Sequence, residues 1–183
     1  MAEIILITGG SRSGKSALAQ RRAEALAGPR LYLATCPVID AETAERVQRH
    51  REARSAACWE TLEEPVDLAG AVSRAAGYRV LLVDCLTLWI NNLLYEAERR
   101  GGRFTEEQAA LCCRELIATC AAFPGTIVFV TNEVGMGIVP EHEAVRRFRD
   151  CAGRCNQLLA AAAAEVILVC AGIPLCLKGK TAG

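Results

Sequence analysis

The sequence predicts an α/β fold in which helices cover both faces of a mostly parallel sheet. Two observations support this prediction. Five short runs of β-branched and other apolar residues are nearly continuous, which is typical of strands buried on both faces. Longer segments with a helical pattern separate the runs, so crossover helices are expected to join the strands. The predicted strands are Glu3–Thr8, Arg30–Thr35, Arg79–Asp84, Thr126–Thr131 and Glu165–Cys170.

The remaining segments complete this pattern. A shorter apolar run, Ile173–Gly179, is expected to add a short antiparallel strand at an edge of the sheet. Because no repeat, linker or low-complexity tail interrupts the alternation, residues 1–183 are predicted to form a single domain. The predicted helices are Lys15–Ala27, Ala41–Ala57, Val66–Ala76, Leu86–Arg99, Thr105–Phe123 and His142–Ala164.

The composition argues against several classes of function. Twenty-one basic residues balance twenty-one acidic ones, so no overall field attracts nucleic acid or an anionic membrane. No cationic leader or long apolar span is visible, and we therefore expect a cytoplasmic protein without a membrane segment. The ten cysteines form no C-x-x-C pair, and several, such as Cys85 and Cys170, lie in apolar runs. This pattern indicates buried thiols in a reducing compartment.

The clearest functional motif follows the first predicted strand. The stretch GGSRSGKS satisfies G-x-x-x-x-G-K-[ST], the phosphate-binding P-loop between a strand and a helix. Its glycines let successive backbone N–H groups point inward, and the positive end of the following helix faces the same space. Lys15 is expected to reach the β- and γ-phosphates, and Ser16 to bind Mg²⁺. The loop consists of Gly9, Gly10, Ser11, Arg12, Ser13, Gly14, Lys15 and Ser16.

Asp84 is the candidate for a second metal-binding group. It ends a buried apolar strand, where P-loop proteins place an acid that holds magnesium. Asp84 could instead, or in addition, cap the helix that follows. We favour the metal role because the P-loop is present. Asp84 and Ser16 therefore predict a site for Mg²⁺ and a nucleoside triphosphate, although the loop alone does not identify the group that accepts a phosphate.

His50 lies in the stretch ERVQRHREAR, where Arg46 and Arg54 fall on the same stripe of the predicted helix. Two neighbouring cations disfavour the protonated imidazole, so a neutral and nucleophilic ring is expected. The arginines could bind phosphate oxygens while the ring attacks a phosphorus atom. The alternative is an ordinary solvated helix, because Glu42 and Glu45 each precede an arginine by four residues. Taken alone, the stretch favours the solvated helix and leaves both interpretations open.

A second candidate region is the loop Asn132–Pro140. It begins at the carboxyl end of a predicted strand, where ligand-binding loops gather in parallel sheets. Asn132 and Glu133 are therefore secondary candidates. An alternative of equal weight is a turn in which Gly135 and Gly137 serve only the backbone.

Five stretches together resemble one enzyme family. They are ILITGGSRSGKS, YLAT, RVQRHREAR, LLVDCLTLWINNLL and VTNEVGMGIVPEHEAVRRFRDCAGRCNQLLAAAA. In order and spacing they are similar to the bifunctional adenosylcobinamide kinase / adenosylcobinamide-phosphate guanylyltransferase family, which prepares the nucleotide loop of coenzyme B12. The resemblance covers nearly the whole chain. It implies a P-loop fold related to the RecA-like ATPases and a homo-oligomeric assembly, a trimer.

The resemblance implies two reactions. Members phosphorylate the hydroxyl of adenosylcobinamide with ATP or GTP. They then transfer GMP from GTP to a histidine, and from the histidine to adenosylcobinamide phosphate, which gives adenosyl-GDP-cobinamide. One alternative is a P-loop kinase for another small alcohol, without a covalent histidine intermediate. Another is a nucleotide-binding module that regulates without catalysing transfer.

The resemblance also implies roles for individual residues. His50 matches the guanylylated histidine, and Asp84 lies near the metal. The chain departs from the family pattern at Arg49, where a second histidine is common, and at Glu60, where an arginine is usual. The other implied guanine-nucleotide positions are Leu33, Ala34, Thr35, Arg51, Glu52, Ala53, Arg54 and Glu63.

Overall fold

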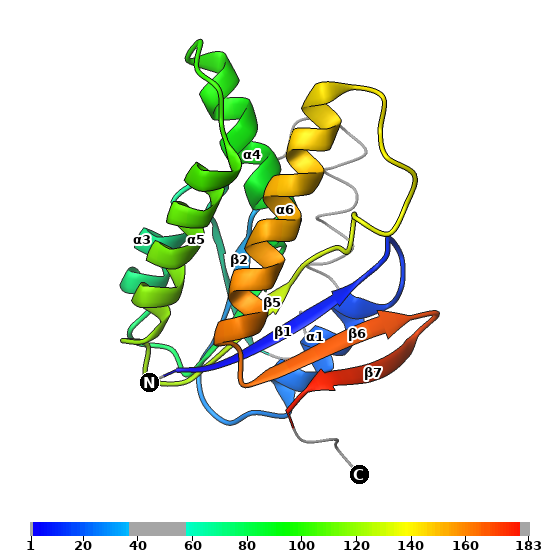
Figure 1. Cartoon of the computed structure of the whole chain (residues 1–183). Helices are drawn as coiled ribbons and strands as arrows, with labels where there is room; N and C mark the ends of the chain where they lie inside the picture. The colour runs from blue at the N-terminus through cyan, green and yellow to red at the C-terminus, as the bar shows by residue number, and fades with distance from the viewer. Residues whose placement is uncertain (1, 37–57, 180–183) are drawn as a thin grey trace.

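A computed structural model describes residues 2–36 and 58–179 of the chain (Figure 1). Within these ranges seven strands form one sheet in the order β3-β2-β4-β5-β1-β6-β7. Neighbouring strands run parallel from β3 to β6, and β7 runs antiparallel to β6 at the edge. The strands are β1 (Glu3–Gly9), β2 (Arg30–Ala34), β3 (Trp59–Glu63), β4 (Val80–Asp84), β5 (Thr126–Val130), β6 (Glu165–Cys170) and β7 (Ile173–Lys178).

Helices cover both faces of the sheet. Figure 1 shows α3, α4, α5 and α6 on one face and α1 on the other. The predicted helix Ala41–Ala57 lies outside the described residues. No helix within the described ranges is both long and apolar enough to cross a bilayer. The described helices are α1 (Lys15–Glu24), α3 (Leu68–Arg74), α4 (Leu86–Arg99), α5 (Glu106–Cys120) and α6 (Glu143–Ala162).

The two helical layers explain why the middle of each central strand is apolar. In β1, Ile4 and Leu6 join the buried cluster beneath α3 to α6, whereas Ile5 and Ile7 join the cluster beneath α1. Successive side chains of a strand point to opposite faces, so a strand covered on both faces has no position left for polar residues. The predicted α/β fold with a mostly parallel sheet is confirmed.

The largest difference from the sequence prediction is strand β3. The segment Trp59–Glu63 pairs in parallel with β2, although no strand was expected there. Three of its five residues are exposed, because β3 is an edge strand whose faces are only partly covered. It therefore lacks the apolar run that indicates a central strand. The helix Val66–Ala76 is also shorter than predicted, because Asp67 caps it by accepting a hydrogen bond from the Gly70 N–H.

All ten cysteines lie in the described ranges and carry free thiols. Cys85, Cys113, Cys120, Cys151 and Cys155 are buried, as expected for small apolar residues in packed helices and strands. The expectation is wrong for Cys58 and for Cys170 at the end of β6, which are exposed. The apolar run did not reveal the exposure of Cys170, which is the last residue of β6, whereas Val169 before it is buried.

The strand order places the functional candidates at one end of the sheet. Parallel strands bring their carboxyl ends to the same edge, and ligand sites form there. The P-loop follows β1, Asp84 ends β4, and β5 lies between these two strands. The loop that starts at Asn132 therefore emerges between the P-loop and Asp84.

Candidate active site

The P-loop joins β1 to α1, and its backbone requires glycine at two positions. Gly9 has φ +153°, and a Cβ atom there would lie 2.3 Å from the carbonyl oxygen of Val169. Gly14 has φ +95° and is the N-cap of α1. A glycine cap has no side chain to satisfy the first N–H groups of the helix, which therefore remain suited to binding an anion. The geometry is that of a phosphate cradle.

Replacing Gly9 by alanine should lower the free energy of unfolding by about 2–4 kcal/mol, because the new methyl group collides with a backbone oxygen of the neighbouring strand. Urea denaturation measures this loss. Gly10 provides the matched control, because a Cβ atom there meets nothing within 4 Å. Gly10→Ala should cost less than about 1 kcal/mol. Equal losses for the two variants would contradict the steric explanation.

Lys15 packs against the backbone of the P-loop. Lys15 is only 8% exposed, and its ammonium group donates a hydrogen bond to the Gly10 carbonyl oxygen at 2.9 Å. The pKa of the Cys85 thiol is raised to about 11, first by burial and then by the Asp84 carboxylate, while the Lys15 charge opposes the rise. The charges of Lys15 and Asp84 therefore act on the same buried thiol, with opposite effects on its pKa.

Asp84 is held by a hydrogen bond and does not cap a helix. The Tyr32 hydroxyl donates to Asp84 Oδ2 at 3.1 Å. The N-cap of α4 is Cys85, so the alternative role of Asp84 as a helix cap is wrong. Asp84 and Ser16 are both half-buried and offer oxygen ligands, which suit Mg²⁺. No group of three or more His, Cys, Asp or Glu side chains in the described ranges could hold a metal ion, so phosphate and water oxygens would have to complete the coordination sphere at Asp84 and Ser16.

A buried network fixes the end of β2. The Cys85 N–H donates to Thr35 Oγ1 at 2.8 Å, and the Thr35 hydroxyl donates to the Cys85 carbonyl oxygen at 2.7 Å. Asn92 on α4 donates its amide to the carbonyl oxygens of Thr35, at 2.8 Å, and Pro65, at 3.0 Å. Leu33 is fully buried and Ala34 half-buried. The side chains of Leu33 and Thr35 are therefore buried inside the protein. The sequence pattern did not indicate the role of Asn92.

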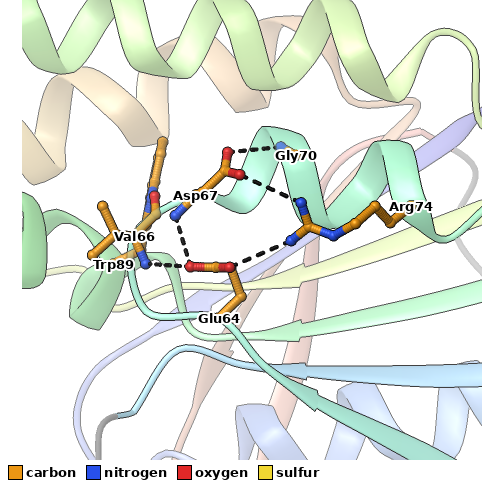
Figure 2. Close-up of polar contacts among 6 residues, drawn as sticks. All are labelled: Glu64, Val66, Asp67, Gly70, Arg74 and Trp89. Atoms are coloured by element: carbon orange, nitrogen blue, oxygen red, sulfur yellow. Dashed lines mark hydrogen bonds and ion pairs between the residues drawn. The ribbon is translucent and has the colours of Figure 1, made fainter.

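Two adjacent carboxylates at the end of β3 have different environments. Glu63 is exposed on the last residue of the strand. Glu64 instead accepts hydrogen bonds from the N–H groups of Val66, at 3.1 Å, and Asp67, at 2.9 Å. Its carboxylate also pairs with Arg74 at 3.4 Å (Figure 2). Glu64 therefore stabilises the start of α3. Glu63, which is exposed, remains the candidate for the guanine-nucleotide site.

The loop Asn132–Pro140 is not shaped by its glycines. Neither Gly135 nor Gly137 has a positive φ, and a Cβ atom at Gly137 would meet nothing within 4 Å. The interpretation of this loop as a turn that requires glycine is therefore not supported. Its tip instead presents apolar side chains to solvent, since Met136 is 81% and Ile138 97% exposed.

Several predicted site residues cannot be placed in this geometry. His50 and residues 51–54 lie outside the described residues, so their assignment remains a prediction. The structure brings together the P-loop, Asp84 and the end of β2 at the carboxyl edge of the sheet. These elements come from three separate parts of the chain.

Comparison with known proteins gives consistent results over almost the whole length. A family model described as cobinamide kinase / cobinamide phosphate guanyltransferase matches residues 5–177. The bifunctional adenosylcobalamin biosynthesis protein CobU of Salmonella typhimurium is 43% identical, with 96% of this chain and 99% of the relative covered. The bifunctional adenosylcobalamin biosynthesis protein CobP of Pseudomonas aeruginosa is 44% identical, with 96% and 97% covered. CobU of Escherichia coli is 42% identical, with 96% and 99% covered. The chain therefore belongs to the cobinamide kinase / cobinamide phosphate guanyltransferase family.

Proposed function

We propose that this chain phosphorylates adenosylcobinamide with ATP or GTP and then converts the product to adenosyl-GDP-cobinamide with GTP. The observation that carries this proposal is the match to the family over residues 5–177. The P-loop between β1 and α1 supports it, because both reactions use a nucleoside triphosphate. We further propose that a single domain carries both activities, and that the enzyme acts in the cytoplasm as a homotrimer.

In the kinase reaction, the P-loop and the start of α1 bind the phosphates of the donor nucleotide. Lys15 neutralises part of the negative charge on the β- and γ-phosphates. The substrate hydroxyl oxygen attacks the γ-phosphorus, the bond from that phosphorus to the bridging oxygen breaks, and the nucleoside diphosphate leaves. The hydroxyl proton passes to solvent. Ser16 and Asp84 would hold Mg²⁺, which offsets phosphate charge when it is bound.

In the transfer reaction, His50 is the nucleophile. A neutral imidazole nitrogen attacks the α-phosphorus of GTP, pyrophosphate leaves, and a phosphorus–nitrogen bond joins GMP to the enzyme. A phosphate oxygen of adenosylcobinamide phosphate then attacks the same phosphorus. The phosphorus–nitrogen bond breaks, the histidine is restored, and the product contains a new diphosphate. The arginines on either side of His50 in RVQRHREAR support this role, because they can bind the reacting phosphates.

Incubation with GTP labelled at the α-phosphate tests the proposal. We expect a covalent protein adduct that is labile in acid and stable in alkali, as a histidine phosphoramidate should be. GTP labelled at the γ-phosphate should leave the protein unlabelled, because that phosphate departs with pyrophosphate. The absence of an adduct, together with kinase activity toward cobinamide, would instead support a P-loop kinase in which the histidine has no covalent role.

A further inference from the structure

After β5 ends, the chain continues beside β1 as far as the first residue of the P-loop. The N–H of Thr131 donates to the Ile7 carbonyl oxygen at 3.0 Å, and the N–H of Glu133 donates to the Gly9 carbonyl oxygen at 3.1 Å. This is the pairing pattern of a parallel ladder, and it places the intervening residue, Asn132, beside the first residue of the P-loop. Neighbouring strands lie about 4.8 Å apart, so a side chain at this position is within reach of a phosphate held by the loop.

The face to which Asn132 points follows from its neighbour. The hydroxyl of Thr131 donates to Asn156 Oδ1 on α6 at 2.8 Å and lies 3.3 Å from the hydroxyl of Thr87 on α4. Thr131 therefore faces the layer formed by α3 to α6. Because side chains alternate along an extended chain, Asn132 faces the opposite layer, where α1 begins at the P-loop.

Asp84 lies on this same face. Val80 and Leu82, at alternate positions of β4, belong to the cluster beneath α1, and Asp84 continues that series. Asp84 pairs with Val130 in the ladder between β4 and β5, so Asn132 lies two residues beyond the level of the acid. The amide is thus between the P-loop strand and the strand of the proposed metal-binding acid.

The backbone of Asn132 is held by residues from the face of the sheet that α3 to α6 cover. Its N–H donates to the Thr87 hydroxyl at 2.7 Å, and its carbonyl oxygen accepts from the Asn156 amide at 3.1 Å. The side-chain amide of Asn132 is half-buried and forms no hydrogen bond with any described residue. Glu133 differs, because its carboxylate accepts from the Gly135 N–H at 2.9 Å and so orders the loop.

We propose that the Asn132 side-chain amide donates a hydrogen bond to the terminal phosphoryl group of the bound nucleoside triphosphate, with Thr87 and Asn156 as its positioning residues. The proposal rests on the triphosphate binding proposed above. A neutral amide suits this position, because it stabilises the negative charge on the phosphoryl oxygens without a charge of its own. A rigid backbone keeps that donor oriented before transfer begins.

Asn132→Ala tests the phosphate contact. We expect kcat for phosphorylation of cobinamide to fall about 10²-fold, the usual loss for one donor to a reacting group. Titration should show about tenfold weaker binding of a non-hydrolysable triphosphate, with diphosphate binding changed less than about twofold, because only the triphosphate carries the contacted group. Unchanged kcat and unchanged triphosphate binding in a variant that folds normally would overturn the proposal.

Two substitutions at Thr87 test the positioning role. Thr87→Val keeps the shape but removes the acceptor for the Asn132 N–H, whereas Thr87→Ser keeps the hydroxyl. We expect the valine variant to lose most of the preference for triphosphate over diphosphate and the serine variant to retain it. Equal nucleotide preferences in the two variants would overturn this part of the proposal.

Matched measurements separate this inference from the proposed function. Asn91 is exposed on α4, so Asn91→Ala should bind both nucleotides as the unmodified chain does. If the unmodified chain neither binds triphosphate nor phosphorylates cobinamide, the proposed function fails. If it does both and Asn132→Ala does so equally well, only the role of Asn132 fails.

Discussion

Replacing Lys15 by alanine is expected to reduce kcat/KM about 10²–10³-fold in both the kinase and the guanylyl-transfer reactions. Lys15 is the first residue of α1 and is only 8% exposed, and its ammonium group donates to the Gly10 carbonyl oxygen in the P-loop. A cation in this position neutralises phosphate charge in both reactions, because each begins with a bound triphosphate. Steady-state kinetics with each acceptor measure the two losses.

A matched substitution on the same helix controls for indirect effects. Arg21 is a cation of α1 that is exposed to solvent, so Arg21→Ala removes the same charge without touching the P-loop. We expect it to retain both activities. Lys15→Arg should show little more activity than Lys15→Ala, because a planar guanidinium does not fit the space of a buried ammonium. If Lys15→Ala impaired only one reaction, the two reactions would not share the P-loop.

The fold was predictable wherever burial on both faces left a clear pattern in the sequence. Ile4 to Ile7 alternate between the two cores, and so the central strand β1 is apolar over this whole stretch. Strand β3 could not be found in this way, because Glu60, Thr61 and Glu63 are exposed at the edge of the sheet. The backbone pairing with β2 specifies this strand, and its exposed polar residues leave no apolar pattern that would reveal it.

The candidate site shows the same division between local and long-range information. The P-loop is one contiguous motif and could be located from eight residues. The environment of Asn132 depends on Thr87 and Asn156, which are 45 and 24 residues away along the chain. Only the packing of α4 and α6 against the sheet brings these groups together. Likewise, Glu63 and Glu64 are adjacent residues of the same type. Only the fold shows that Glu64 is the one that stabilises the start of α3.

Replacing His50 by alanine is expected to abolish guanylyl transfer, with a loss of at least about 10⁴-fold, because a missing nucleophile cannot be compensated by the remaining phosphate contacts. The covalent adduct from α-labelled GTP should disappear as well. Phosphorylation of cobinamide should continue within about threefold of the unmodified rate, since that reaction transfers the γ-phosphate directly to the substrate hydroxyl. Product analysis with cobinamide and GTP should therefore show cobinamide phosphate accumulating without GDP-cobinamide.

The only other histidine in the sequence provides the control for this experiment. His142 is exposed at the start of α6 and makes no capping hydrogen bond with its side chain. His142→Ala should form the adduct and both products normally. An equal loss of both activities in His50→Ala would indicate a role in folding or substrate binding. Retention of the adduct in His50→Ala would show that another residue is the nucleophile. The proposed chemistry therefore requires that the two activities separate at His50, while Lys15→Ala impairs both.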